Sequence, residues 1–133
     1  MYFEKNAFYI LGASPGDSRG KIIALCDARV RETDPWLCAR ARDELMDPQS
    51  RLSQELAWLP GASADETNLV RACVAGNRPI PANVKEPVAG FNILFWNLTR
   101  RTYDEPDELA RGVAELDDQF RAIVPEHVRA LVN

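Results

Sequence analysis

Hydrophobic residues recur at spacings of three and four along most of this 133-residue chain, and that spacing is the period of an amphipathic α-helix. Each run of apolar positions is bordered by a proline, a glycine or a side chain that commonly caps a helix. The run over residues 91–96 also fits a strand, but the length of the surrounding pattern favours a helix. The pattern therefore predicts an all-α fold of six or seven short helices.

The first half of the chain shows the helix signals in close succession. A helix is predicted over about residues 19–32. Asp34 and Pro35 then supply an N-cap and a first-turn proline for a short helix, and Asp47 and Pro48 repeat this arrangement for the next one. The apolar positions of these three helices are Ile22, Ile23, Cys26 and Val30; Leu37, Ala41 and Leu45; and Leu52, Leu56 and Leu59.

The second half begins with a capping box, in which Ser63 and Glu66 satisfy each other's free backbone donors. The helix predicted over about residues 86–101 is apolar on nearly all sides, and such a helix normally lies at the centre of a bundle. Further helices are expected from Pro106 and from Pro125. The aromatic residues expected at the centre of this bundle are Phe91, Phe95 and Phe120.

The composition is that of one globular domain rather than two. Apolar residues make up 46% of the chain and charged residues 27%, which is enough to form a core. The net charge of −4 argues against a nucleic-acid partner, because phosphate binding needs an excess of basic residues. No apolar run reaches the roughly 18 residues of a membrane-spanning helix, and no signal peptide is evident. We therefore expect a cytoplasmic protein without a membrane partner.

The polar residues form no pattern typical of catalysis or of ion binding. His127 is the only histidine and follows Glu126 in a first helical turn, which favours a solvated imidazole. Asp117 and Asp118 are adjacent on a helix and point apart, whereas ion sites need convergent ligands. We therefore predict no enzyme activity, no catalytic residues, no cofactor and no metal site. The three cysteines are expected to be buried thiols: Cys26, Cys38 and Cys73.

Three motifs follow one another in the first 51 residues. Residues 7–12 read Ala-Phe-Tyr-Ile-Leu-Gly, residues 34–36 read Asp-Pro-Trp, and residues 47–51 read Asp-Pro-Gln-Ser-Arg. In this order they resemble the J-domain of DnaJ-type co-chaperones, with its Tyr-Tyr-x-x-Leu-Gly opening, its His-Pro-Asp signature and its Asp-Pro-x-x-Arg segment. The resemblance covers residues 5–60 and implies a J-domain-like helical hairpin.

Three departures from the family pattern concern the contact with a DnaK-type ATPase. Asp34 and Trp36 flank Pro35 where the family has the histidine and the aspartate through which J-domains stimulate ATP hydrolysis. The helix over residues 19–32 mixes acidic and basic side chains, whereas the family's second helix is strongly basic, and electrostatic steering needs an excess of one sign. The segment from Asp34 to Leu45 is also shorter than in the family. The resemblance therefore implies a retained scaffold without co-chaperone activity.

Some side chains on the predicted helices allow two interpretations. A buried amide without a partner costs about 1 to 3 kcal/mol, and Asn92 and Asn97 lie on the most apolar helix. Either they bond backbone atoms of this chain, or the helix faces another chain. Trp36 fits either a core position or an exposed anchor that replaces the lost signature.

The function that we expect is a non-enzymatic protein-protein interaction adaptor or assembly module, of bacterial origin. The alternative is a co-chaperone that recruits a DnaK-type ATPase through an altered surface. Residues 86–101 carry more apolar surface than one internal face can use, and such a surplus often marks an interface. The expected partner is an unidentified protein or a second copy of the chain, and the candidate partner-binding residues are Trp36, Ile93 and Trp96.

The domain organisation predicted from these patterns has two parts. Residues 1–60 are expected to form the J-domain-like helices, and residues 61–133 a helical extension packed on them as one unit. The apolar pattern still continues at Val132. This pattern fits a last helix docked on the bundle, or a native protein that continues beyond Asn133.

Overall fold

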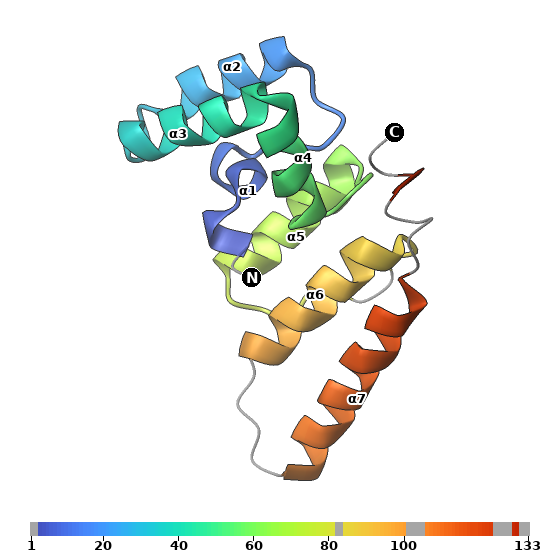
Figure 1. The fold of residues 1–133 in the computed structure, drawn as a ribbon. Coiled ribbons are helices and arrows are strands. Elements are labelled where there is room, and N and C mark those ends of the chain that lie inside the picture. Colours follow the sequence, from blue (N-terminus) through green and yellow to red (C-terminus); the bar gives the residue numbers. More distant parts are fainter. Residues whose placement is uncertain (1–2, 82–83, 101–105, 124–128, 131–133) are drawn as a thin grey trace.

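The computed structural model describes residues 3–81, 84–100, 106–123 and 129–130. These residues contain seven α-helices, one 3-10 turn and no strand, so the predicted all-α fold of six or seven short helices is confirmed (Figure 1). The elements are η1 Phe3–Lys5, α1 Ala7–Leu11, α2 Arg19–Arg29, α3 Pro35–Met46, α4 Pro48–Leu56, α5 Ala64–Ala75, α6 Pro87–Arg100 and α7 Pro106–Ala122. The helix expected from Pro125 lies mostly outside the described residues.

Most helices begin where the sequence predicts a cap. Asp34 and Asp47 accept hydrogen bonds from backbone N–H groups in the first turns of α3 and α4, and each is followed by a proline. Ser63 and Glu66 form the predicted capping box of α5. These caps satisfy backbone donors that would otherwise remain unpaired at a helix start. The positions of the helices therefore follow from local chemistry.

Helix α2 ends earlier than the pattern predicts. The expected helix runs to about residue 32, whereas the observed one stops at Arg29. The backbone N–H groups of Glu32 and Thr33 both donate to the Arg29 carbonyl, and the Thr33 hydroxyl donates to the same atom. These bonds close the chain into a turn, which reverses its direction before α3.

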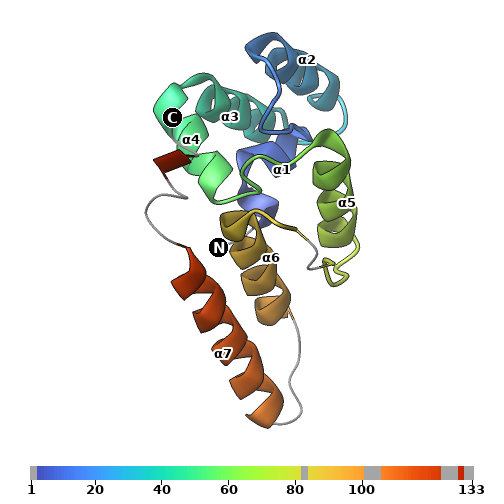
Figure 2. The ribbon, with the colours of Figure 1, turned by 90° about the vertical axis from the view of Figure 1, so that its right-hand side faces the viewer.

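The helices form two groups that meet at the middle of the molecule. Helices α2 and α3 lie side by side, and both contact α1 (Figures 1 and 2). Helices α1, α4 and α5 lie between this pair and α6, and α7 packs against α6. Helix α7 is the most peripheral of the seven described helices in both views.

The centre of the core is a set of three aromatic rings. Phe3, from the 3-10 turn, packs edge-on against Trp58 with ring centroids 4.9 Å apart and stacks on Trp96 at 6.2 Å. All three side chains are buried. Burying large aromatic rings is among the largest single contributions to stability in a chain of this size. The core residues around them include Phe8, Leu11, Ile22, Leu45, Leu59 and Ile93.

The expectation of a core around Phe91, Phe95 and Phe120 is wrong. Phe120 is 63% exposed, and Phe91 and Phe95 are only half-buried. The rings do contact one another, with Phe91 centred 5.8 Å from Phe120 and 6.3 Å from Phe95. Helix α7 packs mainly on α6, so the rings meet on a two-helix hairpin at the edge of the molecule.

The two asparagine side chains of α6 bond to backbone groups elsewhere in the chain, and the bonds of Asn92 join the two predicted parts. The Asn92 side chain donates to the carbonyls of Leu56 and Trp58, each at 2.8 Å. Asn97 pairs with both backbone groups of Ile80, at 2.9 Å each. Both amides are therefore satisfied within this chain, by backbone segments distant in sequence, which favours the first of the two interpretations.

Candidate functional site

The Asp-Pro-Trp segment lies at the start of α3, directly after the turn that leads out of α2. The Asp34 carboxylate accepts a hydrogen bond of 2.9 Å from the backbone N–H of Trp36, which makes Asp34 the N-cap of the helix. Pro35 occupies the first turn, where its missing N–H carries no cost. Asp34 and Pro35 thus hold the backbone while Trp36 projects from it.

Trp36 is 64% exposed, so of the two interpretations for this side chain the core position is wrong. The Arg40 guanidinium lies over its ring, 5.6 Å from the centroid, and Arg40 also pairs with Glu44 at 3.4 Å. Leu37 on the same helix and Ile23 on α2 are exposed by 42% and 41%. Three large apolar side chains therefore reach the solvent on the α2–α3 pair.

Two hollows border α3 beside Trp36 and Leu37. Their volumes are about 460 Å³ and 570 Å³. Arg40 and Glu44, which form an ion pair, line both hollows. The first is lined also by Trp36, Ala39, Asp43 and Ser50, and the second by Glu4, Lys5, Ile10, Leu37, Ala41 and Gln54.

The other two candidate partner-binding residues are in the core. Ile93 is fully buried and Trp96 is 1% exposed. The face of α6 that carries Trp96 and Asn92 is covered by Phe3, which stacks on Trp96, and by the turn that carries Trp58. Ile93 and Trp96 are therefore not available on the surface, and the candidate site reduces to the surroundings of Trp36.

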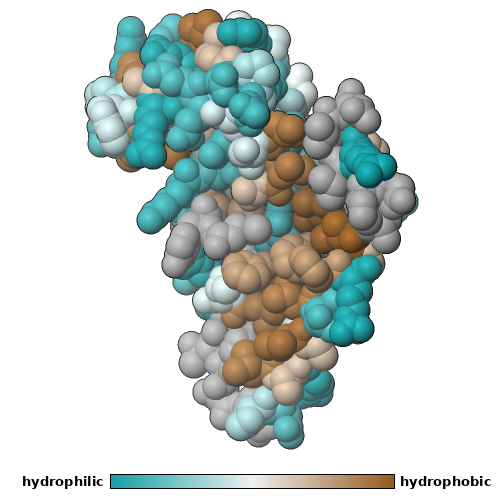
Figure 3. Space-filling view, viewed as in Figure 1, coloured by the Kyte–Doolittle hydropathy of each residue, from teal (hydrophilic) through white to brown (hydrophobic). Residues whose placement is uncertain are grey.

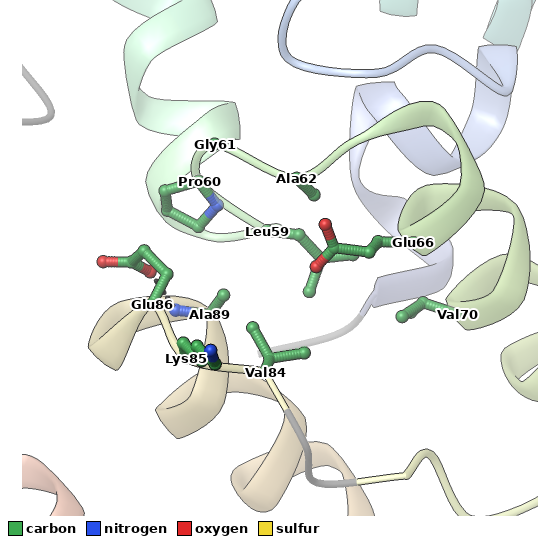
Figure 4. Close-up of a pocket in the computed structure, with 10 residues that line it drawn as sticks. All are labelled: Leu59, Pro60, Gly61, Ala62, Glu66, Val70, Val84, Lys85, Glu86 and Ala89. Carbon is green, nitrogen blue, oxygen red and sulfur yellow. Dashed lines mark hydrogen bonds between the residues drawn. The ribbon is translucent and has the colours of Figure 1, made fainter.

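A third hollow, of about 340 Å³, lies between the α4–α5 turn, α5 and the start of α6 (Figure 4). Its walls are mostly apolar, and Figure 4 shows the Glu66 carboxylate between these walls. That carboxylate serves the capping box, and Glu86 accepts a hydrogen bond from the Ala89 N–H at 2.6 Å. Both acids are thus used as helix caps. Sequence reasoning missed this hollow, because three segments distant in sequence form it.

Apolar surface also extends along α6 and α7 on the face shown in Figure 3. Leu109, Val113 and Phe120 of α7 are 46%, 54% and 63% exposed. These three residues lie at helical spacing on the helix that the sequence predicts from Pro106. The acids Asp117 and Asp118 are exposed on the same helix, and Asp117 pairs with Arg121 at 3.0 Å.

The described residues contain no group of three or more His, Cys, Asp or Glu side chains placed to hold a metal ion. His127 lies outside the described residues. Cys26, Cys38 and Cys73 are free and buried, as predicted, and burial raises the pKa of the Cys26 thiol. Within the described part of the chain, no helix combines the length and the apolar character that crossing a membrane requires.

Comparisons with protein-family models, with curated proteins and with solved structures gave no match to this chain. The J-domain-like resemblance therefore stays a prediction.

Proposed function

We propose that this chain is a non-enzymatic adaptor that binds a protein partner through the surface around Trp36, on a J-domain-like scaffold. The observation that carries this proposal is the 64% exposure of Trp36, on a helix that borders two hollows. Tryptophan is enriched among the residues that contribute most to protein-protein binding, because its large ring fills a pocket at little conformational cost. Trp36 has the chemistry of such an anchor.

The surroundings of Trp36 support a protein partner. Leu37 adds apolar area, while Arg40 and Glu44 provide charges of both signs beside it. An apolar centre with a polar rim is the common composition of a protein-protein interface. A nucleic acid would instead favour a surface that is predominantly basic.

The alternative proposal is a co-chaperone that recruits a DnaK-type ATPase through an altered surface. It is supported by the position of the Asp-Pro-Trp segment, which lies at the junction of two adjacent helices, α2 and α3. Against it, Asp34 and Trp36 replace the two residues that the resemblance requires. The Asp34 carboxylate is already used in capping α3.

The experiment that tests the adaptor proposal compares Trp36→Ala with a matched control. Leu69 of α5 is 50% exposed, so Leu69→Ala removes a similarly exposed apolar side chain from another helix. A partner captured from the native host is purified, and its affinity for wild type and for both variants is measured. We expect Trp36→Ala to weaken binding by about 30-fold or more, the factor for an anchor worth at least about 2 kcal/mol. Leu69→Ala should leave the affinity unchanged.

Equal affinity of wild type and Trp36→Ala for every captured partner would contradict the adaptor proposal. In a second assay, the wild-type chain is added to a DnaK-type ATPase under single-turnover conditions. We expect no stimulation of ATP hydrolysis. Stimulation of several-fold would support the co-chaperone instead.

A further inference from the structure

Two arginine side chains converge on Gly12, at the end of α1. Arg29 comes from the last turn of α2, and Arg71 comes from α5. A methyl group on the Gly12 Cα would lie 3.0 Å from Nη1 of Arg71 and 3.1 Å from Nη2 of Arg29. These two nitrogens are therefore separated by at most the sum of those distances, about 6 Å.

This pair of cations has no acidic partner among the described residues. Each ion pair found in that part of the chain uses a different arginine: Arg40, Arg42, Arg100 or Arg121. Both Arg29 and Arg71 are half-buried. Burial lowers the pKa of Arg71 from its ordinary value, and the nearby charge of Arg29 lowers it further. Two like charges are thus held together where solvent screens them incompletely.

The backbone around Gly12 explains how the arrangement forms. Gly12 has a φ of 71°, a conformation that other residues rarely adopt, and it ends α1 there. Nε of Arg71 donates to the Tyr9 carbonyl at 3.1 Å, and the guanidinium lies 5.5 Å from the centroid of the Tyr9 ring. These contacts fix the orientation of Arg71. They account for one of its nitrogens and for none of those of Arg29.

We infer that Arg29 and Arg71, whose guanidinium groups lie beside the Cα of Gly12, form a binding site for a phosphate-type oxyanion. The planar guanidinium group matches the oxygens of phosphate, and charge-assisted hydrogen bonds of about 2.7 to 2.9 Å can bridge nitrogens at this separation. A divalent anion neutralises both cations, whereas a single carboxylate neutralises only one. This site is separate from Trp36, and the inference does not depend on the proposed adaptor function.

The test uses inorganic phosphate as the probe, in isothermal titration with the whole chain. Acetate and chloride at the same ionic strength serve as comparison anions. We expect phosphate to bind wild type, and Arg29→Gln or Arg71→Gln to weaken that binding by about tenfold or more, as expected for the loss of a charge-assisted hydrogen bond. The control is Arg19→Gln, which removes an equal charge from an exposed position on α2.

Thermal unfolding without phosphate provides a second measurement, because it shows whether each variant is still folded. The Arg29 side chain makes no hydrogen bond or ion pair with the described residues, so Arg29→Gln should fold and should relieve the repulsion with Arg71. We expect its melting temperature to equal or exceed that of wild type, and its response to phosphate to be lost. The inference is overturned if phosphate acts on wild type no differently from acetate or chloride. It is also overturned if Arg29→Gln responds to phosphate as wild type does, or if the control Arg19→Gln weakens phosphate binding as much as Arg29→Gln does.

Discussion

Trp96 and Trp36 are the same kind of residue in opposite environments, and replacing each with alanine tests the structure directly. Trp96 is 1% exposed and stacks on Phe3, with its ring centroid 6.2 Å away. Trp36 is 64% exposed and contacts the Arg40 guanidinium. Trp96→Ala should therefore leave a cavity in the core, whereas Trp36→Ala should remove only surface contacts.

The two substitutions should differ several-fold in their effect on stability. Truncating a buried aromatic residue to alanine typically lowers the free energy of unfolding by about 3 to 5 kcal/mol. The exposed contact of Trp36 with a cation is worth about 0.5 to 1 kcal/mol. With an m-value of about 2 kcal/mol/M in urea, Trp96→Ala should lower the unfolding midpoint by about 1.5 to 2.5 M and Trp36→Ala by less than about 0.5 M.

Urea unfolding followed by far-ultraviolet circular dichroism measures both midpoints on one helical signal. Trp96→Phe is the control for the aromatic ring, because Nε1 of Trp96 has no hydrogen-bond partner among the described residues. That variant keeps the stack on Phe3 and should cost clearly less than Trp96→Ala. The reasoning is refuted if Trp96→Ala and Trp36→Ala shift the midpoint equally, or if Trp36→Ala is the more destabilising.

Three further predictions concern other parts of the chain. Asn92→Ala leaves the carbonyls of Leu56 and Trp58 without the donor of Asn92, and should lower the free energy of unfolding by about 2 to 3 kcal/mol in urea titration. Ser63→Ala removes the cap of α5 and should cost about 1 kcal/mol in the same assay, with Ser53→Ala, whose hydroxyl bonds within a helix, as the control. Burial raises the pKa of Glu55, so the folded state binds a proton more readily than the unfolded state does. The stabilisation linked to that proton is present below the ordinary pKa of glutamate. It is lost as the pH rises through the raised pKa that Glu55 has in the folded state. Glu55→Gln should therefore raise the free energy of unfolding at neutral pH and flatten its dependence on pH; an unchanged pH profile would contradict this.

The helix boundaries were largely predictable because the signals for them are local. Ser63 and Glu66 are three residues apart, and Asp34 and Pro35 are adjacent, so each cap is visible in the sequence itself. The end of α2 was not predictable in this way. It depends on the bonds that Thr33 makes to the Arg29 carbonyl, and the apolar pattern continues past that point.

The identity of the core was less predictable than the helices. Spacing shows that Phe120 belongs to an apolar stripe, but not whether another helix covers that stripe. Phe3 lies in a 3-10 turn before the first α-helix, yet its ring packs against two tryptophans at the centre of the fold. Likewise, Trp36 could be named from the sequence as a candidate partner-binding residue. The closeness of the Arg29 and Arg71 side chains, in contrast, depends on how α2 and α5 are placed. Contacts of this kind are set by tertiary packing.

The position of Phe3 also has a consequence for how the chain folds. The ring that completes its packing, Trp96, lies more than ninety positions further along the sequence. Contacts between such distant residues form late, because closing a long loop costs entropy before the contact is gained. During synthesis, the first helices can form while Phe3 and Trp58 are still partly open to water. The stack of Phe3 on Trp96 can then form only after α6 has left the ribosome, so the aromatic core is completed late in synthesis.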